Sequence, residues 1–276
     1  MGLRIYNNIE AMNAHRNLGS TATNIGKAME RLSSGLRINR AADDAAGLAV
    51  SEVMRAQVRG MGVAQRNAHD GISLVQVADG AMGTAQDMLQ RARDLAVQAS
   101  NGTLTDTQRT NLDKEVQQIL TEVGKVGSDT DFNGIKILAG SVAAAASAVT
   151  LQVGANGSQT IGFTIGTVST SDLGISGIAV STQASASAAI ASIDSALATL
   201  STARATMGSI QNRLEQTITR LGVTSENLQA AESRIRDADM AQEMIRFTKN
   251  QILQQSGTAM LAQANQAPQS VLSLLR

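Results

Sequence analysis

The stretch from Met54 to Ala99 constrains the fold of this chain more than any other. Its apolar residues and alanines recur in steps of four and three: Met54, Val58, Met61, Ala68, Ile72, Val75, Met82, Ala85, Leu89, Ala92, Ala96 and Ala99. The polar residues Gln65 and Asp79 fill the two gaps in this row. Such a repeat, sustained over about six heptads, predicts one long helix that stays in contact with other long helices.

A second apolar row accompanies this seam, mostly one residue earlier and therefore about 100° further round the helix. Its members are Leu74, Val77, Ala81, Met88 and Leu95. A helix whose other side faces water needs only one row. The second row therefore predicts a second contact surface, for something other than the chain's own core.

Shorter helices are expected on either side of the long one. The same spacing predicts a helix over Leu3–Leu36, a connector from Ser33 in which Asp43 or Asp44 caps the next helix, and the long helix from about Ala45. Asn101-Gly102 ends the long helix, and another begins at Thr105 or Asp106 and stops near Gly127.

The second half of the chain starts with a neutral region. Asp172 is the only charged residue between Ile137 and Ile193, and Asn133-Gly134 and Asn156-Gly157 adjoin apolar, β-prone runs, which predicts hairpins. Helix returns near Gln183. We expect a break at Gly222 and Thr224, then a last helix in which Glu232 and Arg236 form an i,i+4 pair.

Composition excludes several classes of partner. The 276 residues carry no net formal charge and include only four aromatic residues, which argues against nucleic-acid binding. There are no cysteines, and no apolar run approaches the ~20 residues that span a bilayer. The N-terminus lacks the apolar centre of a secretory signal. We therefore expect no membrane partner, and either a cytosolic protein or one exported without a cleavable signal.

No catalytic, cofactor or metal site is recognisable. His15 and His69 lack the spacing of metal ligands and are interpreted as helix-surface residues. Residues 129–134 resemble the start of an EF-hand loop, but its twelfth position is Gly140 rather than a glutamate, which favours a turn and hairpin. Gly60-Met61-Gly62 lies inside the seam, where glycine allows close packing. We expect no cofactor and no enzymatic activity.

Six segments resemble bacterial flagellins. They are Leu32–Ala49, Asn67–Met82, Leu89–Thr103, Asn212–Glu215, Glu226–Met244 and Ala259–Arg276. The chain departs from many flagellins in its middle, where the neutral β-region replaces large variable outer domains. The sequence is therefore similar to that of a short flagellin. A hook–filament junction protein is the alternative, but the match in both inner segments favours flagellin.

The resemblance implies a mainly α fold, namely a long antiparallel helical coiled-coil bundle formed by the N- and C-terminal segments with a small central β-hairpin region. Residues 1–43 and 226–276 would form the terminal coiled coil of the inner filament tube. Residues 44–225 would form a helical bundle with its β-region at about 130–182.

The resemblance also implies a structural subunit that polymerises into the bacterial flagellar filament for motility. Such a subunit would leave the cell unfolded through the flagellar type III export channel and fold at the filament tip. Its implied partners are other copies of the chain, the flagellar cap protein, the hook–filament junction protein, an export chaperone and the animal Toll-like receptor for flagellin.

Two sets of site residues follow from the resemblance. The receptor set is Arg91, Leu95 and Glu115. The subunit-contact set is Leu18, Ile25, Met29, Leu32, Leu74, Val77, Met88, Ile235, Ile245 and Ile252. The alternative interpretation pairs Arg91 with Asp87 and places Leu95 in ordinary packing. Because Leu95 belongs to the second apolar row, we expect the receptor to recognise monomers only.

Overall fold

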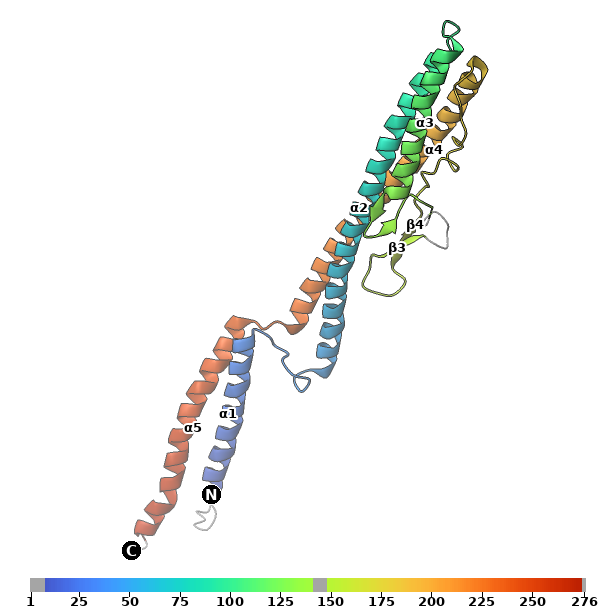
Figure 1. The fold of residues 1–276 in the computed structure, drawn as a ribbon. Coiled ribbons are helices and arrows are strands. Elements are labelled where there is room, and N and C mark those ends of the chain that lie inside the picture. The colour runs from blue at the N-terminus through green and yellow to red at the C-terminus, as the bar shows by residue number, and fades with distance from the viewer. Residues whose placement is uncertain (1–7, 141–147, 275–276) are drawn as a thin grey trace. The chain divides into compact units, whose positions relative to one another are not determined.

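The computed structural model describes residues 8–140 and 148–274, and these are mainly helical (Figure 1). In chain order the elements are α1 (Ile9–Ser34), α2 (Ala45–Ala99), α3 (Asp106–Asp129), β1 (Asp131–Phe132), β2 (Ile135–Lys136), β3 (Val149–Gln152), β4 (Thr160–Phe163), α4 (Gln183–Arg236) and α5 (Met240–Leu274). The predicted fold class, mainly α with a small β-hairpin region, is confirmed. The chain divides into two compact units, a terminal unit (Met1–Ala56 with Asn227–Arg276) and a bundle unit (Gln57–Glu226).

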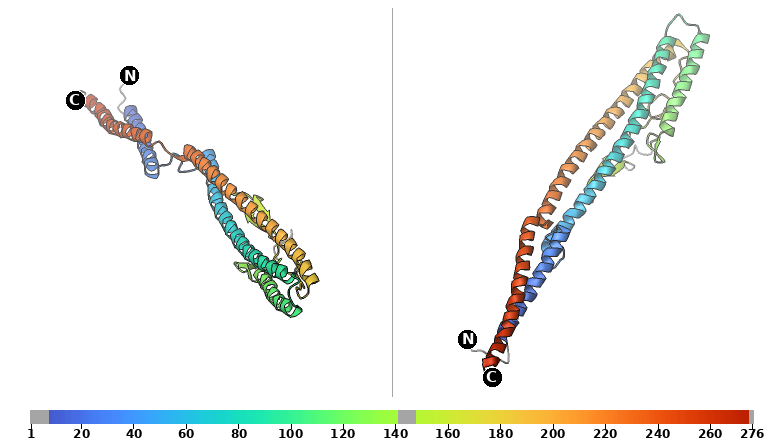
Figure 2. Two further views of the ribbon diagram at one scale, coloured as in Figure 1. Left: turned by 90° about the horizontal axis from the view of Figure 1, so that it is seen from above. Right: turned by 90° about the vertical axis from the view of Figure 1, so that its left-hand side faces the viewer.

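Within the bundle unit, α2 and α4 run antiparallel, and α3 returns beside α2 after a short turn (Figures 1 and 2). Arg93 on α2 pairs with Asp194 on α4 at 2.6 Å. Further along, Arg204 on α4 pairs at 2.8 Å with Asp79, one of the two polar gaps in the seam. From Met82 to Ala99 every seam residue is fully buried. The spacing of four and three therefore identified the face of α2 that enters the core.

Both predicted hairpins form, with different turns. β1 and β2 are joined by Asn133-Gly134, whose φ angles of 53° and 78° match the left-handed backbone of a type I′ turn. β3 and β4 pair from Val149 with Phe163 to Gln152 with Thr160. Their longer connection places Ser158, rather than the Asn156-Gly157 pair, at positive φ.

The β3–β4 hairpin lies on α2 where glycines leave room for it. A Cβ at Gly60 would lie 3.1 Å from the Cα of Ala155, and one at Gly71 would overlap the side chain of Leu151. The Asn67 side chain donates to the carbonyl oxygen of Gln152 at 3.0 Å. Close packing at Gly60 is thus confirmed, whereas Gly62 faces open space.

In the terminal unit, α1 and α5 form an antiparallel pair. The Asn8 side chain accepts from the Ala11 N–H as the N-cap of α1 and donates to the Ala264 carbonyl at 2.7 Å. Leu18 packs where Gly257 leaves space on α5. α1 ends at Gly35, whose φ of 71° is the left-handed conformation that stops a helix. The predicted start of this helix at Leu3 lies outside the described residues.

The predicted helix break at Gly222 and Thr224 is wrong, because α4 continues to Arg236 and the break falls at 237–239. Leu221 is buried, and the Thr224 hydroxyl donates to the Arg220 carbonyl inside the helix. A single glycine costs a helix about 1 kcal/mol. Packing of the neighbouring residues offsets that cost.

Candidate assembly and recognition surfaces

The terminal unit leaves many of its large apolar side chains exposed. On α5 these are Met240, Met244, Ile245, Ile252, Leu253 and Met260, each between 46% and 69% exposed. Met244, Ile245, Ile252 and Leu253 line one continuous surface, here called the α5 apolar face. On α1, Ile9, Met12 and Met29 are more than half exposed. Within residues 8–56 and 227–266, only Ala28 and Ile38 are buried hydrophobic residues.

Backbone pairing joins the segment after α1 to the segment before α5. Leu36 and Asp237 form an antiparallel bridge. The Arg37 N–H donates to the Arg236 carbonyl at 2.7 Å, and the Ala238 N–H donates to the Gly35 carbonyl at 2.9 Å. These bonds hold the C-terminus of α1 beside the N-terminus of α5.

Charged side chains reinforce this joint. Glu243, only 6% exposed, lies 3.8 Å from Arg31 and 3.4 Å from Arg246. The Asp43 carboxylate accepts hydrogen bonds from the backbone N–H groups of Arg40 and Asn39, which lower the pKa of Asp43 below its ordinary value. Asp43 thus holds the connector turn, and Asp44 caps α2 through the N–H of Gly47 at 2.9 Å.

The predicted Glu232–Arg236 pair is wrong, because both side chains pair with α2 instead. Glu232 lies 3.1 Å from Arg55, and Arg236 lies 2.6 Å from Glu52. On each of the two helices the carboxylate faces a guanidinium group of the other helix. Ion pairs between α2 and α4 therefore replace the expected pair along α4.

The predicted subunit-contact residues differ in how far they are exposed. Met29, Val77, Ile245 and Ile252 are exposed, while Leu18, Ile25, Leu32 and Ile235 are half-buried. Met88 is half-buried and packs on the bundle core, and Leu74 is only 7% exposed within it. Leu74 is therefore corrected to a core residue. Because α3, α4 and the β3–β4 hairpin all pack on α2, more than one row of its side chains is buried.

The predicted receptor residues lie where α2 and α3 meet. Arg91 pairs with Glu115 at 2.8 Å rather than with Asp87, and their side chains are 60% and 44% exposed. Leu95 is only 2% exposed and belongs to the bundle core. The structure thus corrects Leu95 from a surface residue of the second row to a packing residue, while Arg91 and Glu115 form an exposed ion pair.

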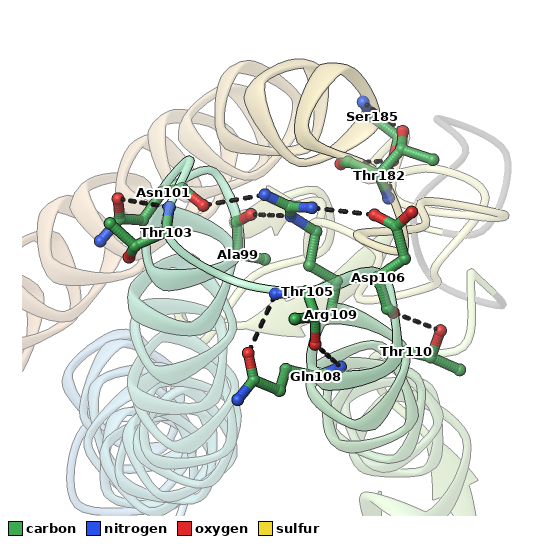
Figure 3. A network of polar contacts seen from close by, with 10 residues as sticks. All are labelled: Ala99, Asn101, Thr103, Thr105, Asp106, Gln108, Arg109, Thr110, Thr182 and Ser185. Carbon is green, nitrogen blue, oxygen red and sulfur yellow. Dashed lines mark hydrogen bonds and ion pairs between the residues drawn. The ribbon is translucent and has the colours of Figure 1, made fainter.

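A buried arginine fixes the turn between these two helices (Figure 3). The Arg109 guanidinium donates to the carbonyls of Ala99 and Asn101 at 2.9 Å, and it also pairs with Asp106 at 2.9 Å. The two carbonyls lie at the C-terminus of α2, where helical hydrogen bonding leaves acceptors unpaired. Thr105 and Gln108 form a capping box at the start of α3.

Replacing Arg109 with methionine should destabilise the bundle unit by about 2–3 kcal/mol, because three hydrogen bonds to a charged, buried donor are lost. Urea unfolding followed by circular dichroism measures the change. Asp106→Ala is the control, since its side chain is 89% exposed and an exposed ion pair contributes about 1 kcal/mol or less. Equal effects of the two substitutions would contradict the role assigned to Arg109.

Across 8–140 and 148–274, no three His, Cys, Asp or Glu side chains gather closely enough to hold a metal ion. Within the same ranges, no helix has both the length and the apolar character needed to cross a membrane.

Two family models match the chain. The bacterial flagellin N-terminal helical region matches residues 5–143, and the C-terminal helical region matches residues 190–275. The chain belongs to the bacterial flagellin family. This flagellin is 50% identical over 274 residues to a flagellin of Halalkalibacterium halodurans, with 99% of both chains covered. It is 47% identical over 284 residues to the flagellar filament 33 kDa core protein of Treponema phagedenis, again over 99% of both.

The fold of this flagellin also resembles that of a putative flagellar hook-associated protein from Vibrio parahaemolyticus. The TM-score is 0.58 over 71% of this chain and all of that chain, but the identity is 13%, so the likeness concerns the fold alone. The family places this flagellin among structural subunits of the flagellar filament. The prediction of a filament protein that is not an enzyme is confirmed.

Several residues that organise the surfaces of this flagellin carried no clear signal in the sequence. Nothing in the sequence distinguishes Arg109 from other helical arginines, because its partner Ala99 lies across the turn on α2. Asp113, which accepts from the Val180 N–H at 2.7 Å, likewise depends on chain segments far apart in sequence. The turn itself was predicted from Asn101-Gly102 and Thr105, and the Thr105-x-x-Gln108 capping box is a further local signal for it.

Proposed function

We propose that this flagellin polymerises by burying the apolar surface of its terminal unit against other copies of the chain. The observation that carries the proposal is the distribution of apolar side chains. The helices of the terminal unit have almost no buried core of their own but expose Ile, Leu and Met along α5 and α1. Isolated helices without packing are marginally stable in water, so such a pair needs further partners.

Assembly then couples folding to binding. Residues 1–43 and 226–276 form the inner tube and acquire their full order only when copies bury their apolar rows together. Residues 44–225 form the bundle outside it. Each copy contacts differently placed copies head to tail, so the interface does not close on itself and a helical fibre results. The exposed members of the predicted contact set, such as Ile245 and Ile252, are the residues most directly involved.

We further propose that the chain is secreted through the flagellar export channel and assembles outside the cell. The cap protein, the hook–filament junction protein and an export chaperone are its proposed partners during this process. Membership of the family supports these proposals, and the absence of cysteine is compatible with passage through reducing and oxidising compartments.

Electron microscopy of purified protein added to filament fragments tests the central proposal. Long extension of the fragments is the expected result. Growth that stops at short junctions would instead favour the alternative, a hook–filament junction protein.

Recognition by the Toll-like receptor for flagellin is a second proposal, centred on Arg91 and Glu115. Their side chains are exposed and form a charged pair that a partner can reach in the monomer. Leu95 supports this surface from beneath rather than touching the receptor, because its side chain is buried. The expectation that only monomers signal rested on Leu95 as a subunit contact, and the burial of Leu95 within its own chain removes that reason.

Arg91→Glu should reduce receptor signalling by roughly tenfold or more. The substitution removes the cation that the receptor would contact and places a second carboxylate beside Glu115. A reporter cell line measures the response. Arg93→Glu is the matched control, since Arg93 pairs with Asp194 of α4 and not with α3. Unchanged signalling by Arg91→Glu would rule the site out. The change should cost the fold about 1 kcal/mol or less.

A further inference from the structure

Among the described residues, exposed methionines occur only in the terminal unit, where Met54 is half-buried. Among the described residues, five methionines are exposed, by 46% to 65%, and all lie on α1 and α5: Met12, Met29, Met240, Met244 and Met260. These are called the surface methionines below. In the bundle unit, Met61, Met82 and Met207 are at most 5% exposed, and Met88 is half-buried.

These thioethers are also the oxidisable groups of the chain. The sequence has no cysteine, so methionine carries all of its sulfur. A peroxide converts an accessible methionine to the sulfoxide, a polar group that disrupts packing at methionine-rich interfaces and can be reversed by methionine sulfoxide reductases. The surface methionines meet the solvent in the monomer, whereas those of the bundle core do not.

We propose that the surface methionines are an oxidation site through which peroxide controls self-association of this chain. The inference rests on the proposed assembly through the terminal unit. In the reaction each sulfur loses two electrons and gains one oxygen atom, the O–O bond of hydrogen peroxide breaks, and one molecule of water leaves. The apolar rows of α1 and α5 thereby acquire S=O dipoles that must be desolvated before copies can pack.

Oxidation should weaken the subunit contacts of the terminal unit without unfolding the bundle unit. Met244 belongs to the α5 apolar face, and the other four surface methionines lie elsewhere on the same two helices. Losing the apolar contact of even one buried methionine weakens association roughly tenfold or more. The bundle unit keeps its fold because its own methionines are shielded. Copies already packed in a filament would be protected for the same reason.

The test treats the purified full-length monomer with hydrogen peroxide and maps sulfoxides by peptide mass spectrometry. We expect oxidation at the surface methionines, little at Met82 and Met207, and extension of filament fragments at least roughly tenfold slower. Treatment with a methionine sulfoxide reductase should restore growth. A variant with leucine at all five surface positions should extend at the same rate before and after peroxide.

The outcomes separate this inference from the proposal on which it rests. Failure of the untreated chain to extend fragments would overturn the proposed assembly itself. Normal extension by a monomer oxidised at the surface methionines would overturn the oxidation site alone, as would continued inhibition of the leucine variant. If the leucine variant does not assemble, recovery after reductase treatment decides the matter, and absence of recovery counts against the inference.

Discussion

Replacing both Ile245 and Ile252 with lysine should abolish extension of filament fragments. The two side chains are 69% and 57% exposed, so the monomer loses almost no packing when they change. In an assembled filament each isoleucine would contribute about 1.5–3 kcal/mol by burial, and a buried lysine charge without a partner costs more still. The monomer concentration needed for growth should therefore rise by roughly a hundredfold or more.

The control for this substitution makes the same chemical change in the bundle unit. Ile135 on β2 is 50% exposed, and Ile135→Lys should leave growth close to that of the unaltered chain. Circular dichroism of each variant checks that the helices remain. Wild-type growth by the α5 double variant would show that the α5 apolar face is not a subunit contact.

Replacing Gly127 with alanine should destabilise the bundle unit by about 1–3 kcal/mol, the usual effect of overpacking. Gly127 lies on α3 against the chain segment that follows β4, and an added Cβ would overlap the carbonyl oxygen of Val168. Val168 is itself buried and its N–H donates to the Leu138 carbonyl at 3.0 Å, so the segment has little room to move.

Gly124→Ala, one turn earlier on the same helix, is expected to stabilise the bundle unit instead. Its Cβ would lie 3.4 Å from the Thr170 side chain, an ordinary contact, and alanine favours the helix by about 1 kcal/mol over glycine. Urea unfolding of both variants measures the difference. Equal effects of the two substitutions would show that the contact with Val168 does not constrain α3.

The helices of this flagellin were predictable because each one repeats its apolar residues over many turns. The seam of α2 is a clear example, since its seam residues from Met82 to Ala99 are all buried. Local turn chemistry was equally informative, as at Asn133-Gly134 and at the Asp44 cap. These features depend on neighbours within about four residues, so a sequence displays them directly.

Predictions failed where a residue has more than one available partner. The second apolar row of α2 suggested a free surface, but Leu74 and Leu95 enter the core because several elements pack on that helix. Glu232 and Arg236 had the spacing for a pair along α4, yet both found closer partners on α2. The glycine at 222 did not end α4, because packing decides whether one poor helix former is tolerated.

The sequence by itself was enough to predict the family and the helices. It also showed that the termini carry apolar rows. Only the tertiary structure decided which of those rows are covered within one chain and which, such as the α5 apolar face, stay open. The reason is physical: periodicity shows that a helix has an apolar side, but burial depends on how many other segments reach that side.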